Sequence, residues 1–505
     1  MHQPYYKNLL TGESDLPWVR LHGVKDYLDM LQILEKFPKI KQTFNVVPSL
    51  FEQIEDYNNG CVKDKYSELT KKPANELTEQ DKEFILKNFF SINKDKVIAT
   101  FPRYYELYFR RQHNNEFSTQ DYLDLQVCFN LAWVDPSFRQ NMPELKKIVF
   151  KERFFSEQDK QIVLDKQLEI LRQIIPTYCA AQQNGQIEIS VTPYYHPILP
   201  LLCSTNIAKE ANKKTVLPKK EFAYPKDAKN QIDSAVEFYL QRFGSAPVGM
   251  WPSEEAVSEH ILPIIIDAGI KWIVTDEAIL FKSLKIKKRD TKLLYQPHLL
   301  KRKGGELNII FRDCNLSDLI GFSYCKMKEI DAVNNFMAHL ENINKAFKDK
   351  DILVTIAMDG ENAWEFFRND GHDFLELFYQ RISDCEFIKT TTISEYLKLN
   401  PAKQTIKRLS AGSWIYGEFG KWIGNPYKVK AWEYLTVARA ALEKTENPSA
   451  LAYKQMHILE GSDWFWWFGE DADGSFDKLF RLHLSNFYKL INQEPPSYLK
   501  DPITP

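Results

Sequence analysis

Short runs of apolar and β-branched residues recur along the chain, and most of them end in polar or acidic residues. Runs that are apolar at nearly every position predict strands buried on both faces, as in a parallel sheet. Six such strands and one weaker candidate are predicted at residues 43–48, 187–193, 248–254, 272–277, 308–313, 352–361 and 387–392.

Segments with helical spacing of apolar residues lie between the predicted strands. They include residues 24–34, a helix over 232–239 that ends near Gly244, and residues 256–268 with Ser253 as N-cap. This alternation predicts an α/β fold, either a barrel or a doubly wound sheet. Because no glycine-rich phosphate-binding fingerprint follows an early strand, a Rossmann domain is disfavoured. Polar residues at successive strand ends favour a barrel of the (β/α) type, which builds its active site there.

Two regions depart from the alternation. Residues from about 58 to 183 are mostly helix-like and charged, which predicts a helical insertion between two strands. After residue 401 the pattern becomes helical again. We therefore expect a catalytic domain over residues 1–400, including the insertion, and a C-terminal helical domain over residues 401–505 that contributes aromatic residues to the cleft.

Composition narrows the possible partners and the compartment. The formal net charge of the 505 residues is −2 and no basic stripe is present, so nucleic acid is not an expected partner. The seven cysteines are scattered without zinc-site spacing, which indicates a reduced, intracellular protein, and we expect a cytoplasmic location. No apolar stretch is long enough to span a membrane, and no signal peptide opens the chain, so no membrane partner is expected.

A cluster of large aromatic residues surrounds Asp463, within residues 462–467. Rings beside carboxylates are typical of sites that stack on sugars, and a buried indole needs a partner for its N–H. Neighbours in sequence point in different directions, so one or two of these rings are expected to stack on sugar while the others pack. Asp463 itself is predicted to line a subsite, with a turn or helix-cap carboxylate as the alternative.

Two carboxylate motifs end predicted strands, at residues 251–255 and 358–364. Each stands beside a tryptophan. Facing carboxylates are what glycosidic cleavage requires, one as nucleophile or base and the other as proton donor. Taken singly, a carboxylate at a strand end is more often part of an ion pair or a cap. Together, in a barrel context, Glu254 and Asp359 are predicted to be catalytic.

These motifs make the chain resemble glycoside hydrolase family 57. Residues 2–4, 185–197, 250–254, 358–362 and 462–467 are similar to the five characteristic regions of that family, over essentially the whole chain. The last three look most like the α-amylase and amylopullulanase side of the family.

The resemblance implies an incomplete (β/α)7 barrel with a helical insertion and a C-terminal helical domain. It also implies a retaining hydrolase of α-glucans such as starch, glycogen or maltooligosaccharides, acting on α-1,4 bonds and with α-1,6 bonds as a further option. Glu254 would be the nucleophile of a double displacement and Asp359 its general acid. Alternatives are a 4-α-glucanotransferase or branching enzyme of the same family, or a non-catalytic glucan-binding protein.

Glu254 has a close rival in Glu255. The family pattern has the nucleophile at the third residue after the tryptophan, which selects Glu254. Glu255 would then begin the following helix, where a negative charge suits the positive end of the helix dipole.

Further residues are predicted to contact the substrate, with packing or structural hydrogen bonding as the alternative for each. They are His2, Gln3, His196, Trp251, Glu361, Trp364, Trp414, Asp463 and Trp464. No His-x-x-His or paired-aspartate arrangement occurs, so neither a metal nor another cofactor is expected. The expected partner is therefore the α-glucan substrate alone.

The N-terminal motif raises one more expectation. In the family, the His-Gln-Pro motif follows a complete first strand, whereas His2 here follows Met1 directly. We therefore expect the first barrel strand to be truncated in this sequence. A signal sequence upstream of Met1 is compatible with that expectation.

Overall fold

A seven-stranded sheet runs through the middle of the protein. The structure, a computed structural model, describes residues 1–348, 350–361, 364–470 and 474–504. The strand order is β2-β4-β5-β6-β8-β7-β9, and neighbouring strands are parallel except for the antiparallel pair β7 and β8. The strands are β2 (Gln42–Val46), β4 (Ile187–Val191), β5 (Gly249–Met250), β6 (Trp272–Asp276), β7 (His298–Arg302), β8 (Gly305–Arg312) and β9 (Gln404–Thr405).

Five of the predicted strands are confirmed, as β2, β4, β5, β6 and β8. The prediction for residues 352–361 is wrong, because these residues form no ladder. Their backbone makes single contacts instead: Asp313 N–H donates to Thr355 O at 2.7 Å, and Leu353 N–H donates to the carbonyl of Tyr295 at 3.0 Å. Residues 387–391 are likewise irregular. The hairpin strand β7 was not predicted, since its five residues include three polar ones.

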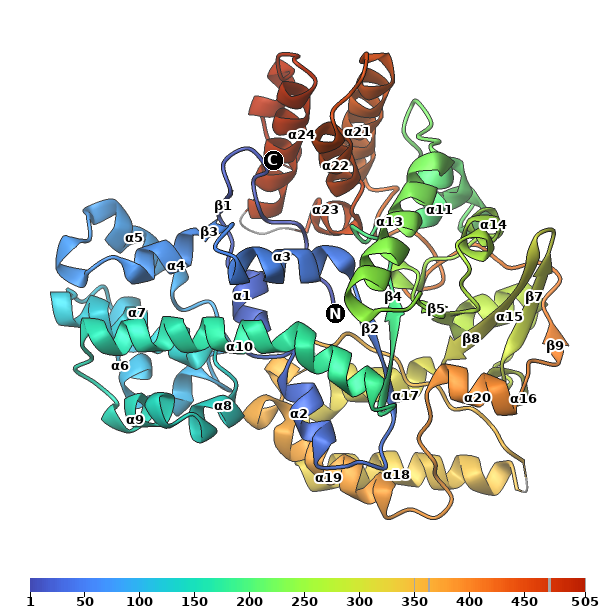
Figure 1. The fold of residues 1–505 in the computed structure, drawn as a ribbon, viewed down its shortest axis with the longest axis horizontal. Helices are drawn as coiled ribbons and strands as arrows, with labels where there is room; N and C mark the ends of the chain where they lie inside the picture. The colour runs from blue at the N-terminus through green and yellow to red at the C-terminus, as the bar shows by residue number, and fades with distance from the viewer. Residues whose placement is uncertain (349, 362–363, 471–473, 505) are drawn as a thin grey trace.

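The segment between β2 and the adjacent parallel strand β4 is almost entirely helical (Figure 1). Capping boxes at Thr78, Ser118 and Ser156 fix where three of its helices begin, including the 27-residue α10. The helices are α3 (Pro48–Asn58), α4 (Lys65–Lys71), α5 (Glu79–Asn88), α6 (Pro102–Gln112), α7 (Thr119–Ala132), α8 (Pro136–Asn141), α9 (Pro143–Lys151) and α10 (Glu157–Gln183).

Helices also occupy the later connections, and α18 packs against α19 at the bottom of Figure 1. They are α11 (Leu199–Cys203), α12 (Ala208–Ala211), α13 (Pro225–Phe243), α14 (Leu262–Asp267), α15 (Glu277–Leu284), α16 (Thr291–Leu294), α17 (Cys314–Asp318), α18 (Glu329–Ala346), α19 (His372–Ser383) and α20 (Ile393–Leu399). As expected, α13 ends at Gly244, whose φ of 73° is left-handed.

The helix predicted over residues 256–268 begins later than expected, at Leu262. The Val257 backbone instead exchanges hydrogen bonds with Gly412, at 2.8 and 3.1 Å. These bonds hold the chain extended where the helix was expected to start. Ser253 therefore caps no α-helix and opens a short 3₁₀ turn.

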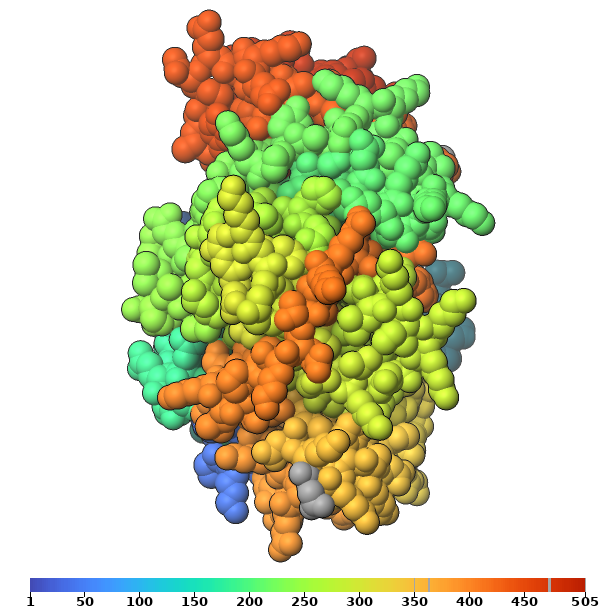
Figure 2. Space-filling view, turned by 90° about the vertical axis from the view of Figure 1, so that its right-hand side faces the viewer, coloured from blue at the N-terminus to red at the C-terminus, as the bar shows by residue number. Residues whose placement is uncertain are grey.

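The chain stays with the sheet beyond residue 401, which corrects the expected start of the helical region. β9 pairs with β7 at the edge of the sheet, and Figure 2 shows the orange part of the chain running between yellow parts of the surface. Helices begin only at Pro426, and they form the red part at the top of both views. They are α21 (Pro426–Lys444), α22 (Ala450–Leu459), α23 (Ser462–Trp467) and α24 (Ser475–Leu490).

The N-terminal residues begin at the end of β2, and Tyr5 then contacts His483 of the C-terminal helix α24. The Met1 amino group donates to the carbonyl of Asn45 at 3.3 Å. Farther along, β1 (Glu13–Ser14) pairs with β3 (Lys63–Asp64) in a separate two-stranded sheet, and α1 (Trp18–Gly23) and α2 (Asp29–Glu35) follow. Within the described residues β2 is an edge of the main sheet.

One continuous hydrophobic cluster joins the sheet, the insertion and the C-terminal helices. A smaller cluster of Trp272, Val274 and Ile310 lies apart from it and contacts partly buried side chains that include Leu353 and Ile393. The extended segment around Leu353 therefore covers part of the sheet without joining it. None of the described helices is long and apolar enough to cross a membrane.

Candidate active site

Glu254 stands on a strained turn directly after β5. Glu254 and Glu255 both have left-handed backbones, with φ of 58° and 53°. Non-glycine residues in this region cost on the order of 1 kcal/mol or more each, and such strain gathers at functional sites. Glu254 is 7% exposed, whereas Glu255 is completely buried. The expectation that Glu255 begins a helix is therefore wrong.

Trp414 holds the Glu254 side chain in place. Its indole Nε1–H donates to Glu254 Oε2 at 2.7 Å, and its backbone N–H donates to the Glu254 carbonyl at 3.2 Å. The Trp414 ring meets the edge of Trp251 at 5.6 Å between centroids, and the Arg312 guanidinium lies 5.0 Å above it. A donor fixed by packing on both sides is well placed to stabilise an ionised carboxylate.

Two histidines from distant parts of the sequence stack beside Glu254. The rings of His2 and His196 are parallel to within 10°, with their centroids 3.8 Å apart. His2 Nε2 lies 3.0 Å from Asp463 Oδ1, and His196 Nδ1 lies 2.8 Å from the hydroxyl of Ser462. The motif on α23 thus reaches the site through Ser462 and Asp463.

The two imidazoles differ in charge. Burial by itself would lower the pKa of His2, but the Asp463 carboxylate, together with Glu254 and Glu361, raises that pKa to about 9. Burial, together with the positive charges of His2 and the N-terminus, holds the pKa of His196 well below its usual value. At neutral pH the stack is therefore one imidazolium on one neutral ring.

The carboxyl group of Glu254 is itself strongly perturbed. Burial, with added repulsion from Asp359 and Asp463, raises its pKa to about 8, against the opposing influence of His2 and the Trp414 N–H. A group poised in this range, beside a cation and a fixed donor, is typical of a catalytic carboxyl.

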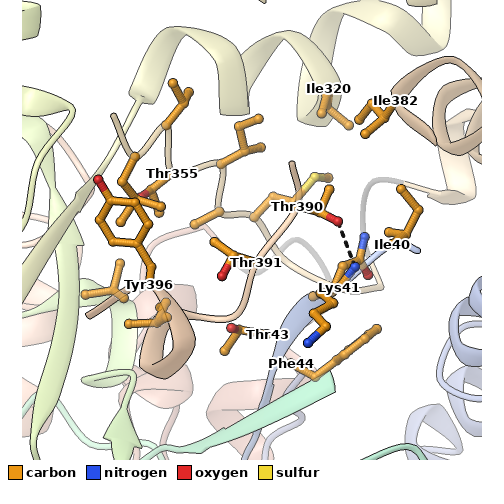
Figure 3. Close-up of a pocket in the computed structure, with 18 of the residues that line it drawn as sticks. Ile40, Lys41, Thr43, Phe44, Ile320, Thr355, Ile382, Thr390, Thr391 and Tyr396 are labelled. Atoms are coloured by element: carbon orange, nitrogen blue, oxygen red, sulfur yellow. Dashed lines mark hydrogen bonds between the residues drawn. The ribbon is translucent and has the colours of Figure 1, made fainter. Parts of the chain in front are cut away.

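Asp359 and Glu254 line the same cavity, of about 700 Å³. The predicted residues His2, His196, Trp251, Trp364 and Trp414 also line it. Figure 3 shows another part of this cavity, where Lys41 and Thr43 of the β2 region face Thr390, Thr391 and Tyr396. The cavity thus runs from the carboxylates to the space between β2 and the extended segment around Thr355.

Three residues that were predicted to contact the substrate, Gln3, Glu361 and Asp463, do not line the cavity. The Glu361 carboxylate accepts from the His2 backbone N–H at 3.1 Å, and Asp463 bonds the His2 ring. Gln3 is buried between the hydroxyls of Tyr6 and Tyr27, at 2.9 and 3.3 Å. These contacts hold the N-terminal segment, and the sugar contacts expected of the three residues stay predictions. Asn362, next to Glu361, is outside the described residues.

The prediction that Trp464 contacts the substrate is wrong, because its side chain lies in the hydrophobic core. It is 1% exposed, its indole N–H donates to the Ile458 carbonyl at 2.8 Å, and its ring packs against His483. On the short helix α23 the neighbouring side chains diverge, so the rings cannot share one face.

Two residues that shape the site were not among the predicted catalytic or substrate-binding residues. Ser462 orients His196, and its place before Asp463 in the aromatic motif was the available signal. Arg312 pairs with Asp276 at 2.9 Å and approaches Glu255 at 3.9 Å. As the next-to-last residue of the strand predicted over residues 308–313, Arg312 stood at the same rim as the carboxylates.

His2, His196 and Glu254 each offer a ligand atom within 4.8 Å of the others, which is close enough to surround a metal ion. The two rings are stacked, however, and their in-plane lone pairs lie in parallel planes that do not converge on one ion. Each ring also bonds a side chain of α23. The arrangement favours hydrogen bonding and charge stabilisation over coordination.

Known proteins resemble this chain in sequence and in fold. The alpha-amylase 1 of Dictyoglomus thermophilum is 26% identical over 269 residues, which cover 52% of this chain and 33% of that protein. The 4-alpha-glucanotransferase of Thermococcus litoralis is 24% identical over 237 residues, which cover 46% of this chain and 29% of that protein. The matched part thus spans about a third of the length of these relatives.

Solved structures share the fold over nearly the whole chain. The GH57-type branching enzyme from Pyrococcus horikoshii has a TM-score of 0.59 at 17% identity, covering 97% of this chain and 88% of that one. AmyC, described as a novel alpha-amylase from Thermotoga maritima, has a TM-score of 0.57 at 14% identity, with 97% and 91% covered. The model of glycosyl hydrolase family 57 matches residues 1–408, so the chain belongs to this family.

Proposed function

We propose that this chain is a retaining enzyme of α-glucans, with Glu254 as nucleophile and Asp359 as proton donor. The observation that carries the proposal is the setting of Glu254: a buried carboxyl on a left-handed turn, facing the Trp414 N–H and next to the cationic His2. Both influences stabilise the ionised form that a nucleophile needs. Asp359 lines the same cavity, as a partner for proton transfer must.

The proposed reaction has two steps. Glu254 attacks the anomeric carbon while Asp359 gives its proton to the departing glycosidic oxygen, which leaves a glycosyl ester on Glu254. Asp359 then takes a proton from water or a sugar hydroxyl, whose oxygen attacks the ester and frees Glu254. Water gives hydrolysis and a sugar hydroxyl gives transfer, so the same residues serve either outcome.

The substrate class and the barrel form are part of the proposal. Relatives named as alpha-amylase and 4-alpha-glucanotransferase support an α-glucan, with hydrolysis of α-1,4 bonds as the main activity. Five parallel strands with helical connections, partly covered by the extended segment around Leu353, support an incomplete (β/α)7 barrel. Trp251 and Trp414 are the proposed sugar-contacting rings, since both line the cavity beside Glu254.

Product analysis tests the proposal. The wild type is incubated with maltooligosaccharides, starch and pullulan, beside Glu254→Gln, Asp359→Asn and the exposed control Glu306→Gln. Shorter products alone indicate hydrolysis, longer products indicate transfer, and cleavage of pullulan indicates action on α-1,6 bonds. Full activity in both site variants would contradict the proposed roles. Glucan binding without turnover in the wild type would favour a binding protein.

A further inference from the structure

A second cluster of ligand-type side chains lies outside the proposed active site. Asp29, Asp135 and His372 each offer one ligand atom, and these atoms lie within 4.8 Å of one another. His372 Nε2 is 2.7 Å from Asp135 Oδ2 and 3.9 Å from Asp29 Oδ2. Asp29 and Asp135 are 1% and 0% exposed, and His372 is 8% exposed. The cluster is therefore sealed from solvent.

Asp29 lacks the partners that a buried carboxylate requires. Its Oδ1 atom is buried without a hydrogen-bond partner among the described residues. Leaving such a group unpaired costs at least several kcal/mol when it is charged, so buried carboxylates normally pair or bind a metal. The other oxygen, Oδ2, lies 3.9 Å from His372 Nε2, which is too far for a hydrogen bond, so a cation between these two side chains would neutralise the carboxylate.

Two neighbouring cations, Lys25 and His22, are already engaged by other carboxylates. Lys25 pairs with Asp26 and Asp370, and His22 holds the other oxygen of Asp26 at 2.6 Å. Within the described part of the chain, no lysine or arginine forms an ion pair with Asp29 or Asp135. Two buried carboxylates thus share one imidazole, an arrangement that a divalent cation would neutralise.

Asp135 is also held as a metal ligand would be. Its Oδ1 accepts from the Ser137 backbone N–H at 2.8 Å, which leaves Oδ2 directed at His372. Outer contacts of this kind orient ligating carboxylates. Two carboxylate oxygens and one imidazole nitrogen suit a zinc-like ion, with ligand distances of about 2.0–2.2 Å and a fourth ligand such as water.

We propose that Asp29, Asp135 and His372 form a structural site for one divalent transition-metal ion, with Zn²⁺ as the best match. The ion joins the start of α2, the N-cap of α8 in the insertion and the first residue of α19. Asp135 and His372 alone are 237 positions apart in sequence. The ion therefore fastens the insertion and α19 to the N-terminal segment.

Elemental analysis of the whole chain tests this site. The protein is stripped with a chelator, equilibrated with Zn²⁺, and freed of excess ion. We expect one tightly held Zn²⁺ per chain in the wild type. The variants Asp29→Asn and His372→Gln are expected to lose this ion or to bind it at least tenfold more weakly. Asp165→Asn, an exposed change of the same type, is expected to retain it. Glu254→Gln is also expected to retain it, which excludes the cluster of His2, His196 and Glu254 as the binding site.

A second measurement on the wild type covers the case in which a variant does not fold. Chelation is expected to lower Tm, and Zn²⁺ to restore it. Absence of tightly held metal together with a Tm insensitive to both treatments would overturn the proposal, as would unchanged Zn²⁺ binding in folded Asp29→Asn. The three side chains would then be a metal-free hydrogen-bonded cluster.

Discussion

Two clusters in this protein combine histidine with buried carboxylates, and their surroundings differ. His2, His196 and Glu254 line a cavity, and two of these three have left-handed backbones. Asp29, Asp135 and His372 are sealed, and each lies at or next to the start of a regular helix. The types of side chain are the same, so residue identity alone does not assign a role.

Access to solvent separates the two roles, because left-handed backbone occurs next to both clusters: Asn369 and Asp370, just before His372, have φ of 50° and 52°. A strained turn that presents a carboxyl to a cavity is maintained against a cost in stability, which is characteristic of catalytic sites. Helix starts that converge on a closed point connect distant segments and therefore serve stability. Changes at the first cluster should alter turnover, and changes at the second should alter unfolding.

The largest expected effect on turnover comes from Glu254→Gln. Loss of the nucleophile should reduce kcat/KM by a factor on the order of 10⁴ or more. Tm should stay the same or rise, because a neutral amide of equal size replaces a buried acidic group. Steady-state kinetics on a maltooligosaccharide and thermal unfolding measure both effects. A decrease of less than tenfold would remove Glu254 from the mechanism.

The largest expected effect on stability comes from Asp135→Ala. The substitution removes the cap of α8 and the partner of His372. Breaking a buried charged pair costs about 3–5 kcal/mol, so Tm should drop markedly while kcat per folded molecule is maintained. The exposed change Asp165→Ala is the control. A variant of normal Tm with impaired kcat would reverse the assignment of the two clusters.

His2→Gln should change the pH profile. Glu254, with its pKa raised to about 8, is largely protonated at pH 7 and ionises as pH rises, so kcat/KM should increase through this range. The His2 cation opposes that rise in pKa, and its loss should raise the pKa of Glu254 further. The acid limb should then move to higher pH, with a loss of roughly 10–100-fold at pH 7. An unmoved limb would show that the charge of His2 does not act on Glu254.

The smallest expected effects come from substituting two tryptophans, Trp414 and Trp464, which should differ in whether kcat/KM or Tm changes. Trp414→Phe removes the donor to Glu254, and loss of a hydrogen bond to a charged group should reduce kcat/KM about tenfold or more. Trp464→Phe should leave kcat/KM within twofold and lower Tm, since its indole bonds Ile458 within the helical region. Equal kinetic losses in both variants would mean that Trp464 also contacts the site.

The same pair shows what the sequence could reveal. Both tryptophans lie in aromatic segments, and only the fold distinguishes a ring that faces Glu254 from one that faces His483. Glu254 and Asp359 do line one cavity, although Asp359 follows an irregular segment and not the strand that the sequence predicted. The cluster around Asp29 left no local signal, since its members are scattered over the chain.

Errors in the predicted elements have similar causes. Residues 352–361 have the apolar pattern of a buried strand, but their backbone groups bond individually to Asp313, Tyr295 and Ser317. The helix expected after Ser253 is delayed because Val257 bonds Gly412, more than a hundred positions away. Hydrogen bonds to residues distant in sequence override the local pattern in both places, and they do so next to the proposed site.

The central claim is that Glu254 carries the glycosyl ester. A 5-fluoro-α-glucosyl fluoride forms such an ester quickly and releases it slowly, so the labelled protein can be digested and its peptides sequenced by mass spectrometry. The account predicts one fluoroglucosyl group on Glu254, resolved from its neighbour Glu255, and no label in Glu254→Gln. Label on Asp359 or Glu255, or turnover of the natural substrate without any label, would contradict it.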